Sequence, residues 1–331
     1  MMATRDLRSL DAAEVLTLLK SPAPTVICCH ARPDADCLGS GLALALWLKA
    51  MGSDAYCVCA NEIPQYLRFL TKGLQESVLP ESLPMGFENA RVVSVDTSSP
   101  SQMDSLFDAF GDRVSLMIDH HEKGEPYADY FIAHTAACAE LVYRLITASG
   151  VPMSRQMAEL LYAGISSDTG CFRYSNVTPD THFVAAELVK IGIDAASINR
   201  QLHEVRSYES LKAEKAGFER LSFFEEGRIA ILTFPYELQA ELGVRDEHLG
   251  TLIDVARCVS GVELAAAIRG TKDGRYRVSL RASIDVDVAA VAAQFGGGGH
   301  PRAAGVTVDA DSIDGASALI LSALKTALLQ K

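Results

Sequence analysis

The hydrophobic pattern of the first half of the chain alternates between short apolar runs and longer stretches with helical spacing. Apolar runs of strand length lie at residues 25–29, 55–60, 91–95 and 113–118. Helical spacing covers residues 10–19, 41–51, 136–148, 153–165 and 179–191. Thr135 is a candidate cap for the third of these helices, and Thr178 with Pro179 is typical of a helix start. Buried strands that alternate with helices predict an α/β fold with a mainly parallel sheet.

The second half of the chain has a different pattern. Residues 195–218 are helical and heavily charged, as in a connector between domains. Strand patterns then lie at 228–234, 262–269 and 275–282, with helices at 247–259 and 312–329. Asp273-Gly274 predicts a hairpin turn between two of these strands. We therefore expect a catalytic domain at 1–193, a helical linker at 194–220 and a smaller mixed-sheet α/β domain at 221–331.

Length and composition agree with two domains, each with its own hydrophobic core. The chain has 331 residues, of which 49% are hydrophobic, and no run of eighteen apolar residues that could span a membrane. The N-terminal segment MMATRDLRSL lacks the apolar region of a signal peptide. None of the 8 cysteines forms a CxxC pair, which favours reduced thiols. The sequence thus predicts a cytoplasmic protein without a membrane partner.

The charge of the chain limits its partners. The formal net charge is −12, with a pI near 5.1. Proteins that bind long DNA or RNA tightly gain affinity by neutralising phosphates with Lys and Arg. An acidic chain such as this one is a poor candidate for that kind of binding. A nucleic-acid substrate should therefore be short, and should be held by a few basic side chains and metal ions.

Polar groups follow the predicted strands of the first half. His30, Asp34 and Asp36 follow the first strand, in a turn that Pro33 enforces. Asp96 follows a later strand, and Asp119-His120-His121 follow another. Asp168 follows the helical stretch 153–165 and could be only a helix-ending residue beside Gly170. Carboxyl ends of parallel strands are the usual place for ligands in an open α/β sheet, although ordinary turn chemistry is the alternative for each group alone.

The residue types in this set indicate a metal site. Carboxylates and imidazoles without thiolates suit Mn²⁺, Mg²⁺ or Fe²⁺ better than structural zinc. Four crowded carboxylates would repel one another unless cations neutralised them. A carboxylate such as Asp96 could bridge two ions about 3.5–4 Å apart, as in two-metal hydrolases.

A glycine-rich stretch in the second half suggests an anion site. Residues 296–299 are four consecutive glycines, followed by His300, Pro301 and Arg302. Glycines let backbone N–H groups approach a phosphate, and a mere linker explains them poorly. In the strand before them, Arg275, Arg277, Ser279 and Arg281 share one face. A solvated strand face is the alternative for those arginines.

These motifs together resemble a known family. The His30-x-x-x-Asp34-x-Asp36 motif, Asp96, Asp119-His120-His121 and Asp168 resemble the four motifs of the DHH phosphoesterase superfamily. Residues 296–305 resemble the glycine-rich motif of its DHH-associated C-terminal domain. The set, in this order, is similar to the nanoRNase and pAp-phosphatase branch over nearly the whole chain.

The resemblance implies a role for each site residue. His30, Asp34 and Asp96 would hold one metal, and Asp36, Asp96, His120 and Asp168 would hold a second. His121 would face the scissile phosphate, and Asp119 would orient an imidazole. The residues implied to bind substrate are Arg281, Gly297, Gly298, Gly299 and His300. The implied cofactors are two divalent ions, Mn²⁺ first, with Mg²⁺, Co²⁺ or Fe²⁺ as alternatives.

The implied activity is a Mn²⁺-dependent phosphohydrolase of short oligoribonucleotides, linear dinucleotides such as pApA, or 3′-phosphoadenosine 5′-phosphate. A pyrophosphatase or exopolyphosphatase of the same superfamily is an alternative, as is a non-catalytic cyclic-dinucleotide sensor. The glycine stretch and Arg281 argue against the first alternative, and the complete ligand set argues against the second. The resemblance leaves a homodimer open, and the residues do not fix the preferred substrate or the general acid.

Overall fold

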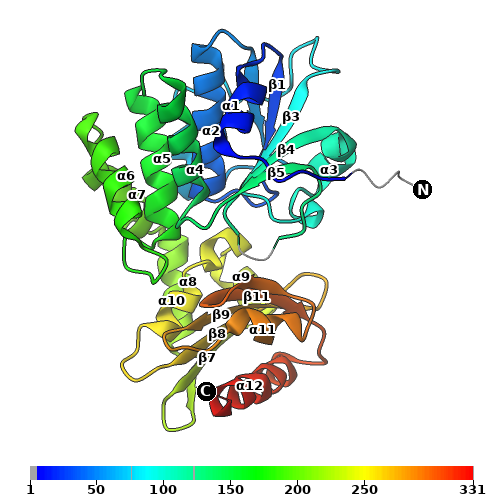
Figure 1. The fold of residues 1–331 in the computed structure, drawn as a ribbon. Helices are drawn as coiled ribbons and strands as arrows, with labels where there is room; N and C mark the ends of the chain where they lie inside the picture. Colours follow the sequence, from blue (N-terminus) through cyan, green and yellow to red (C-terminus); the bar gives the residue numbers. More distant parts are fainter. Residues whose placement is uncertain (1–5, 76, 122–123, 331) are drawn as a thin grey trace. The chain divides into compact units, whose positions relative to one another are not determined.

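The computed structural model describes residues 6–75, 77–121 and 124–330, so residues 1–5 of the N-terminal segment considered above lie outside the described residues. The chain divides into two compact units, Met1–Val205 and Arg206–Lys331 (Figure 1). Each unit has its own sheet and its own hydrophobic clusters.

The first unit is built on a parallel sheet with the strand order β2-β1-β3-β4-β5. Its strands are β1 (Thr25–Cys28), β2 (Ala55–Val58), β3 (Arg91–Val95), β4 (Val114–Asp119) and β5 (Asp129–Ile132). Its helices are α1 (Ala12–Lys20), α2 (Ala35–Ala50), α3 (Ser105–Phe110), α4 (Cys138–Ser149), α5 (Arg155–Asp168), α6 (Pro179–Lys190) and α7 (Ala195–His203). Short 3₁₀ turns lie at Gln65–Thr71, Pro100–Gln102 and Gly111–Arg113.

Helix α2 is the centre of this unit's core. It is buried along most of its length, as its apolar sequence predicts, and it packs against α4 and α5 (Figure 1). The contact with α5 is close at Gly39, where a Cβ would lie 2.4 Å from the backbone oxygen of Leu160. Glycine at this position therefore sets the distance between α2 and α5.

The second unit is built on a mixed sheet with the strand order β10-β11-β9-β8-β7-β6, in which only the β7–β8 pair is parallel among the described strands. Its strands are β6 (Leu221–Phe224), β7 (Ile229–Phe234), β8 (Leu264–Gly270), β9 (Tyr276–Ala282), β10 (Gly298–His300) and β11 (Ala303–Val308). Its helices are α8 (Tyr208–Phe218), α9 (Tyr236–Leu242), α10 (Leu252–Arg257), α11 (Val288–Ala293) and α12 (Ile313–Leu329), with a 3₁₀ turn at Asp246–Leu249. The predicted fold class, a parallel α/β unit followed by a smaller mixed-sheet unit, is confirmed.

Apolar side chains cover the two faces of the second sheet differently. One face packs under α11 and α12 through side chains of β7, β8, β9 and β11. The opposite face packs under α8, α9 and α10 through side chains of β7 and β8. Among the described residues, that second cluster includes no side chain of β9 or β11.

Several predicted element bounds are wrong. Helix α2 begins at Ala35 rather than near residue 41, because Asp34 caps it. Thr135 is not the cap of α4, whose N-cap position is Ala137. The predicted helix at 247–259 is interrupted, since the 3₁₀ turn ends at Leu249 and α10 begins at Leu252.

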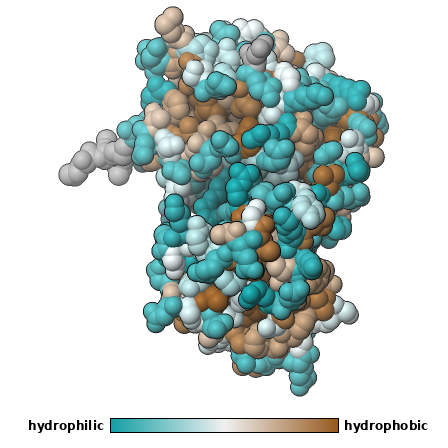
Figure 2. Space-filling model, turned by 180° about the vertical axis from the view of Figure 1, so that it is seen from behind, coloured by the Kyte–Doolittle hydropathy of each residue, from teal (hydrophilic) through white to brown (hydrophobic). Residues whose placement is uncertain are grey.

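In the described part of the chain, no helix combines the length and the hydrophobicity needed to cross a membrane. Figure 2 shows a face on which hydrophilic residues predominate and hydrophobic residues gather in smaller areas. Exposed large hydrophobic side chains include Phe183, Tyr208 and Phe218.

We expect Gly39→Ala to lower the free energy of unfolding by about 1–3 kcal/mol, the usual cost of overpacking a core. The added methyl group would meet the Leu160 backbone, which cannot move aside without shifting α5. Urea unfolding measures the change. Gly250→Ala is a matched control, because a Cβ there would meet no atom within 4 Å. Equal unfolding midpoints for the two variants would contradict this packing.

Candidate active site

Three neighbouring strands of the first unit bring polar side chains to one edge of the sheet. His30 follows β1, Asp96 follows β3, and Asp119, His120 and His121 lie at the end of β4. Because these strands are parallel and adjacent, their carboxyl ends meet. The predicted grouping of strand-end residues is therefore present in space.

His120 lies among carboxylates from three different elements. Its Nε2 atom is 3.3 Å from Asp96 Oδ1, 3.4 Å from Asp168 Oδ2 and 3.8 Å from Asp36 Oδ2. Its Nδ1 atom donates to the backbone oxygen of Thr135 at 3.1 Å, since a carbonyl can only accept. That hydrogen bond directs Nε2 toward the carboxylates, the orientation that metal-binding histidines adopt.

Asp96 occupies the centre of the site. Its Oδ2 lies 3.9 Å from His30 Nε2, and its Oδ1 lies 3.7 Å from His121 Nδ1. Its φ angle is +52°, a left-handed conformation that Asp tolerates better than most residues. Its backbone N–H donates to Ile118 O at 2.9 Å, which ties it to β4. Three groups of candidate metal ligands in this unit share Asp96, each with ligand atoms within 4.8 Å: His30-Cys37-Asp96, Asp36-Asp96-His120 and Asp96-Asp119-His121.

Asp34 has two contacts that explain the start of α2. Its Oδ1 accepts hydrogen bonds from the backbone N–H groups of Asp36 and Cys37 at 3.1 and 2.9 Å. Its Oδ2 lies 3.5 Å from His30 Nε2. One carboxylate therefore caps the helix and faces the site, and Asp36 lies in the first helical turn rather than in a loop as the sequence predicted.

Asp36 is fully buried and caps a second helix. Its carboxylate accepts from Cys138 N at 2.6 Å, Ala139 N at 2.9 Å and Ser40 Oγ at 3.2 Å. These are the first backbone N–H groups of α4, which has no side-chain cap of its own. Gly164 of α5 leaves room for this carboxylate, because a Cβ there would lie 2.6 Å from Asp36 Oδ1.

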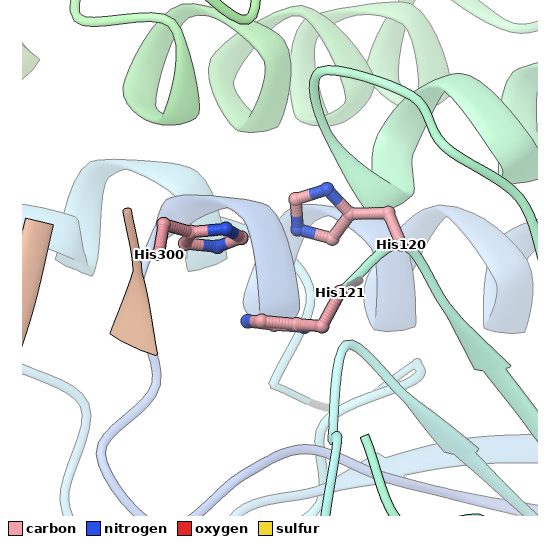
Figure 3. Close-up of side chains that lie close together, drawn as sticks. All are labelled: His120, His121 and His300. Carbon is pink, nitrogen blue, oxygen red and sulfur yellow. The ribbon is translucent and has the colours of Figure 1, made fainter. Parts of the chain in front are cut away.

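Figure 3 shows His120 and His121 side by side at the end of β4, with ring centroids 4.8 Å apart. The Nδ1 atom of His121 donates to Asp119 Oδ1 at 2.7 Å, and the same oxygen accepts from His120 N at 2.8 Å. Asp119 is fully buried, so it fixes the His121 ring without reaching solvent. The figure also labels His300, which belongs to the second unit.

The pKa values of these groups reflect their crowding. Burial, and then the Asp96 carboxylate, raises the pKa of Asp36 to about 7. Burial and the Asp36 carboxylate raise the pKa of Asp168 well above its usual range. Burial alone would lower the pKa of His120, but Asp96, Asp36 and Asp168 raise it far above normal. Asp36 and Asp168 therefore bind protons more readily than exposed carboxyl groups do.

The residues present fit a divalent metal. Asp96 Oδ1 and Asp119 Oδ2 are buried and have no hydrogen-bond partner among the described residues, as expected of atoms oriented toward a cation. Apart from the Cys37 thiol, the candidate donors are carboxylate oxygens and imidazole nitrogens, which suit Mn²⁺, Mg²⁺ or Fe²⁺. This part of the chain can therefore hold a metal ion.

Cys37 lies beside the site, a position for which the sequence indicated no role. Its sulfur accepts from His30 N at 3.1 Å and donates to Val95 O at 3.4 Å. Burial, opposed by the Cys29 thiol, raises the pKa of Cys37, so the thiol stays protonated. Cys37 thus holds together the ends of β1 and β3, from which His30 and Asp96 project.

The second unit contains the residues expected to bind substrate. Arg281 lies on β9, and Gly298, Gly299 and His300 form β10 rather than a loop. A Cβ on Gly297 would lie 2.4 Å from Gly305 O, and one on Gly299 would lie 2.5 Å from Ala303 O. Close pairing with β11 therefore explains two of these glycines without a ligand, whereas a Cβ on Gly298 would meet no atom within 4 Å.

Two domain families match the chain. The DHH family, N-terminal domain, matches residues 24–165, and the DHHA1 domain matches residues 228–326.

Curated relatives match almost end to end. A protein of Thermus thermophilus named bifunctional oligoribonuclease and PAP phosphatase NrnA is 32% identical over 96% of this chain and 93% of its own. A protein of the same name from Bacillus subtilis is 28% identical over 84% of this chain and 87% of its own.

Solved structures match in fold. An exopolyphosphatase-related protein from Bacteroides fragilis has a TM-score of 0.86 at 22% identity, over 97% of each chain. The exonuclease RecJ of Thermus thermophilus in complex with Mn²⁺ has a TM-score of 0.54 at 16% identity, over 98% of this chain and 56% of that one. The domain matches and the curated relatives together indicate a phosphoesterase. The chain belongs to the DHH family, with a DHHA1 domain in its second unit, as the resemblance predicted.

We expect Mn²⁺ to raise the unfolding temperature of the wild-type protein, because a cation that binds only the folded state stabilises it. At a Mn²⁺ concentration one hundred times the dissociation constant, binding adds about 2.7 kcal/mol to the free energy of unfolding. Asp96→Asn removes the shared carboxylate and should abolish most of the shift. Thermal unfolding with Mn²⁺ or with EDTA measures it.

Asp112→Asn, at an exposed position, is the control and should keep the full shift. In EDTA, Asp96→Asn should unfold no earlier than wild type, since Asn accepts positive φ and removes a repelling charge. A full Mn²⁺ shift in Asp96→Asn would contradict a metal site centred on this residue.

Proposed function

We propose that the protein is a Mn²⁺-dependent phosphohydrolase that cleaves short oligoribonucleotides, linear dinucleotides such as pApA, and 3′-phosphoadenosine 5′-phosphate. The observation that carries the proposal is the convergence of three groups of candidate ligands on the buried Asp96. The printed names of the relatives, oligoribonuclease and PAP phosphatase, support the substrate class.

The proposed metal ligands form two sets. His30, Asp34 and Asp96 would hold one ion, in agreement with the approach of His30 to both carboxylates. The second set would be Asp36, Asp96, His120 and Asp168, whose carboxylates lie within 3.8 Å of the His120 ring nitrogen. When bound, such ions supply charge stabilisation on phosphate oxygens and lower the pKa of water.

His121 is proposed to contact the phosphate under attack. Its Nδ1–H is held by Asp119, which fixes the ring and leaves Nε2 for a ligand. Asp119 would therefore act through His121, by orienting it and by stabilising its positive charge. The carboxylates of the two metal sets would repel an anionic substrate. Cations bound among them would neutralise this negative charge and let the substrate phosphate approach.

The second unit is proposed to bind the nucleotide through Arg281, Gly297, Gly298, Gly299 and His300. The open space at Gly298 and the position of Arg281 on the same sheet support this. In functional terms, residues 1–193 would carry out the chemistry, residues 221–331 would bind substrate, and residues 194–220 would connect them. A cytoplasmic location agrees with the free cysteines among the described residues.

The first experiment is a substrate panel with metal titration. Wild-type protein should release products from pApA and 3′-phosphoadenosine 5′-phosphate with Mn²⁺, and EDTA should abolish release. Asp96→Asn should lower kcat on both substrates by about a thousandfold or more, because both proposed ions depend on it. Preferred hydrolysis of pyrophosphate, or wild-type rates in Asp96→Asn with added Mn²⁺, would overturn the proposal.

A second experiment separates binding from chemistry. Arg281→Ala should raise KM for pApA about tenfold and leave kcat nearly unchanged, the result of losing a phosphate contact made before and during reaction. Arg220→Ala, an exposed arginine of the same unit, is the control and should match wild type. A loss confined to kcat would assign Arg281 to the chemical step instead.

A further inference from the structure

One half of the second sheet carries polar side chains on the face opposite α11 and α12, and we call this row of side chains the β9–β11 strip. Its side chains are Arg277, Ser279 and Arg281 of β9, with Thr307 of β11 and His300 of β10. The apolar cluster under α8, α9 and α10 stops at β8 on this face, among the described residues. Gly305 and Thr307 are exposed, and the three β9 side chains are half-buried.

Strand register shows that these side chains share one face. Arg281 pairs with Ala303, Ser279 pairs with Gly305, and Arg277 pairs with Thr307. His300 pairs with the same Ala303 from the other side. Directly opposed residues in antiparallel strands point to the same face. The strip therefore runs from His300 and Arg281 at one end to Arg277 and Thr307 at the other.

At the Arg277 end of the strip, two arginines contact one acid. Asp246 accepts a hydrogen bond from Arg277 with one carboxylate oxygen, and from Arg269 at 3.4 Å with the other. The Arg269 side chain is only 10% exposed, and this carboxylate is one of its partners. Two guanidinium groups thus share one carboxylate, in a protein whose net charge is −12.

Arg277 is suited to bind a further anion. Asp246 occupies one side of its planar group, and a guanidinium has five N–H donors in a fixed arrangement. Thr307 is the residue of β11 that pairs with Arg277, and its exposed hydroxyl group adds a further donor. The absence of a side chain at Gly305 leaves the middle of the strip open.

We propose that Arg277 is a second phosphate-binding side chain, which contacts only substrates longer than a dinucleotide. The inference rests on the proposed function and extends it to a single-stranded oligonucleotide lying along β9. Arg277 and Arg281 are four residues apart, about 13 Å along a strand, which exceeds the distance between neighbouring phosphates. A mononucleotide or dinucleotide at Arg281 therefore ends before Arg277, and a longer strand reaches it.

The experiment compares Arg277→Ala with Arg275→Ala in kcat/KM for 3′-phosphoadenosine 5′-phosphate, pApA and a five-nucleotide oligoadenylate. Arg275 precedes the same strand and pairs with Asp273, so its variant is a matched control for the loss of an arginine beside the strip. Arg277→Ala should lose about tenfold on the five-nucleotide substrate and less than twofold on the two short ones. The slope of the logarithm of the binding constant against the logarithm of salt concentration, measured for the long substrate, should become shallower by about 0.7.

Arg277→Lys keeps the charge and should restore most of the loss on the five-nucleotide substrate. A purely structural role would instead predict equal losses on all three substrates. Binding of a fluorescent five-nucleotide oligoadenylate, followed by anisotropy, is measured in parallel with hydrolysis. If the wild type hydrolyses its substrates but Arg277→Ala loses equal kcat/KM on all three, or loses none, the inference is overturned. The proposed function would then still stand. Binding that depends on Arg277 without hydrolysis would support the strip and overturn the proposed function. Neither binding nor hydrolysis by the wild type would overturn both.

Discussion

The mutual repulsion of buried carboxylates is the constraint on which the first unit depends. Asp36, Asp96 and Asp168 all approach a single nitrogen of His120; the first two are buried and Asp168 is partly exposed. Such a group of acids is stable only if positive charge lies among them, whether as protons, as an imidazolium or as a cation. The surrounding structure supplies fixed dipoles as well, since backbone N–H groups of α2 and α4 point at Asp34 and Asp36. The same crowding of carboxylates favours the binding of a cation among them.

Strand ends were the part of the site that the sequence predicted well. The run Arg91–Val95 has the bounds expected from its apolar residues, and Asp96 follows it directly. A parallel sheet then brings His30, Asp96 and His120 together without further information. The start of α2 was missed because Asp34, Asp36 and Cys37 interrupt the apolar pattern, and the cap acts through a hydrogen bond that hydrophobic periodicity does not register. The position of Cys37 between β1 and β3 likewise has no local signal.

In the second unit, the sequence identified the right residues but only part of their environment. Four glycines suggested a loop that binds an anion, whereas residues 298–300 form an edge strand. Gly297 and Gly299 permit backbones to approach closely, a requirement of tertiary pairing that a linear sequence does not reveal. The arginine face of β9 followed from simple alternation. The sequence did not reveal that Arg277 on this face shares Asp246 with Arg269, because the carboxylate comes from a 3₁₀ turn more than twenty residues away in the chain.

The dependence of α4 on a distant acid has a consequence for how the molecule assembles. The first turn of this helix cannot be completed until α2 has docked beside it, because the carboxylate that satisfies Cys138 and Ala139 belongs to α2. Packing of α2 against α4 therefore also brings Asp36 to its place in the site. The electrostatic cost of bringing the acids of the site together is therefore incurred as the core forms.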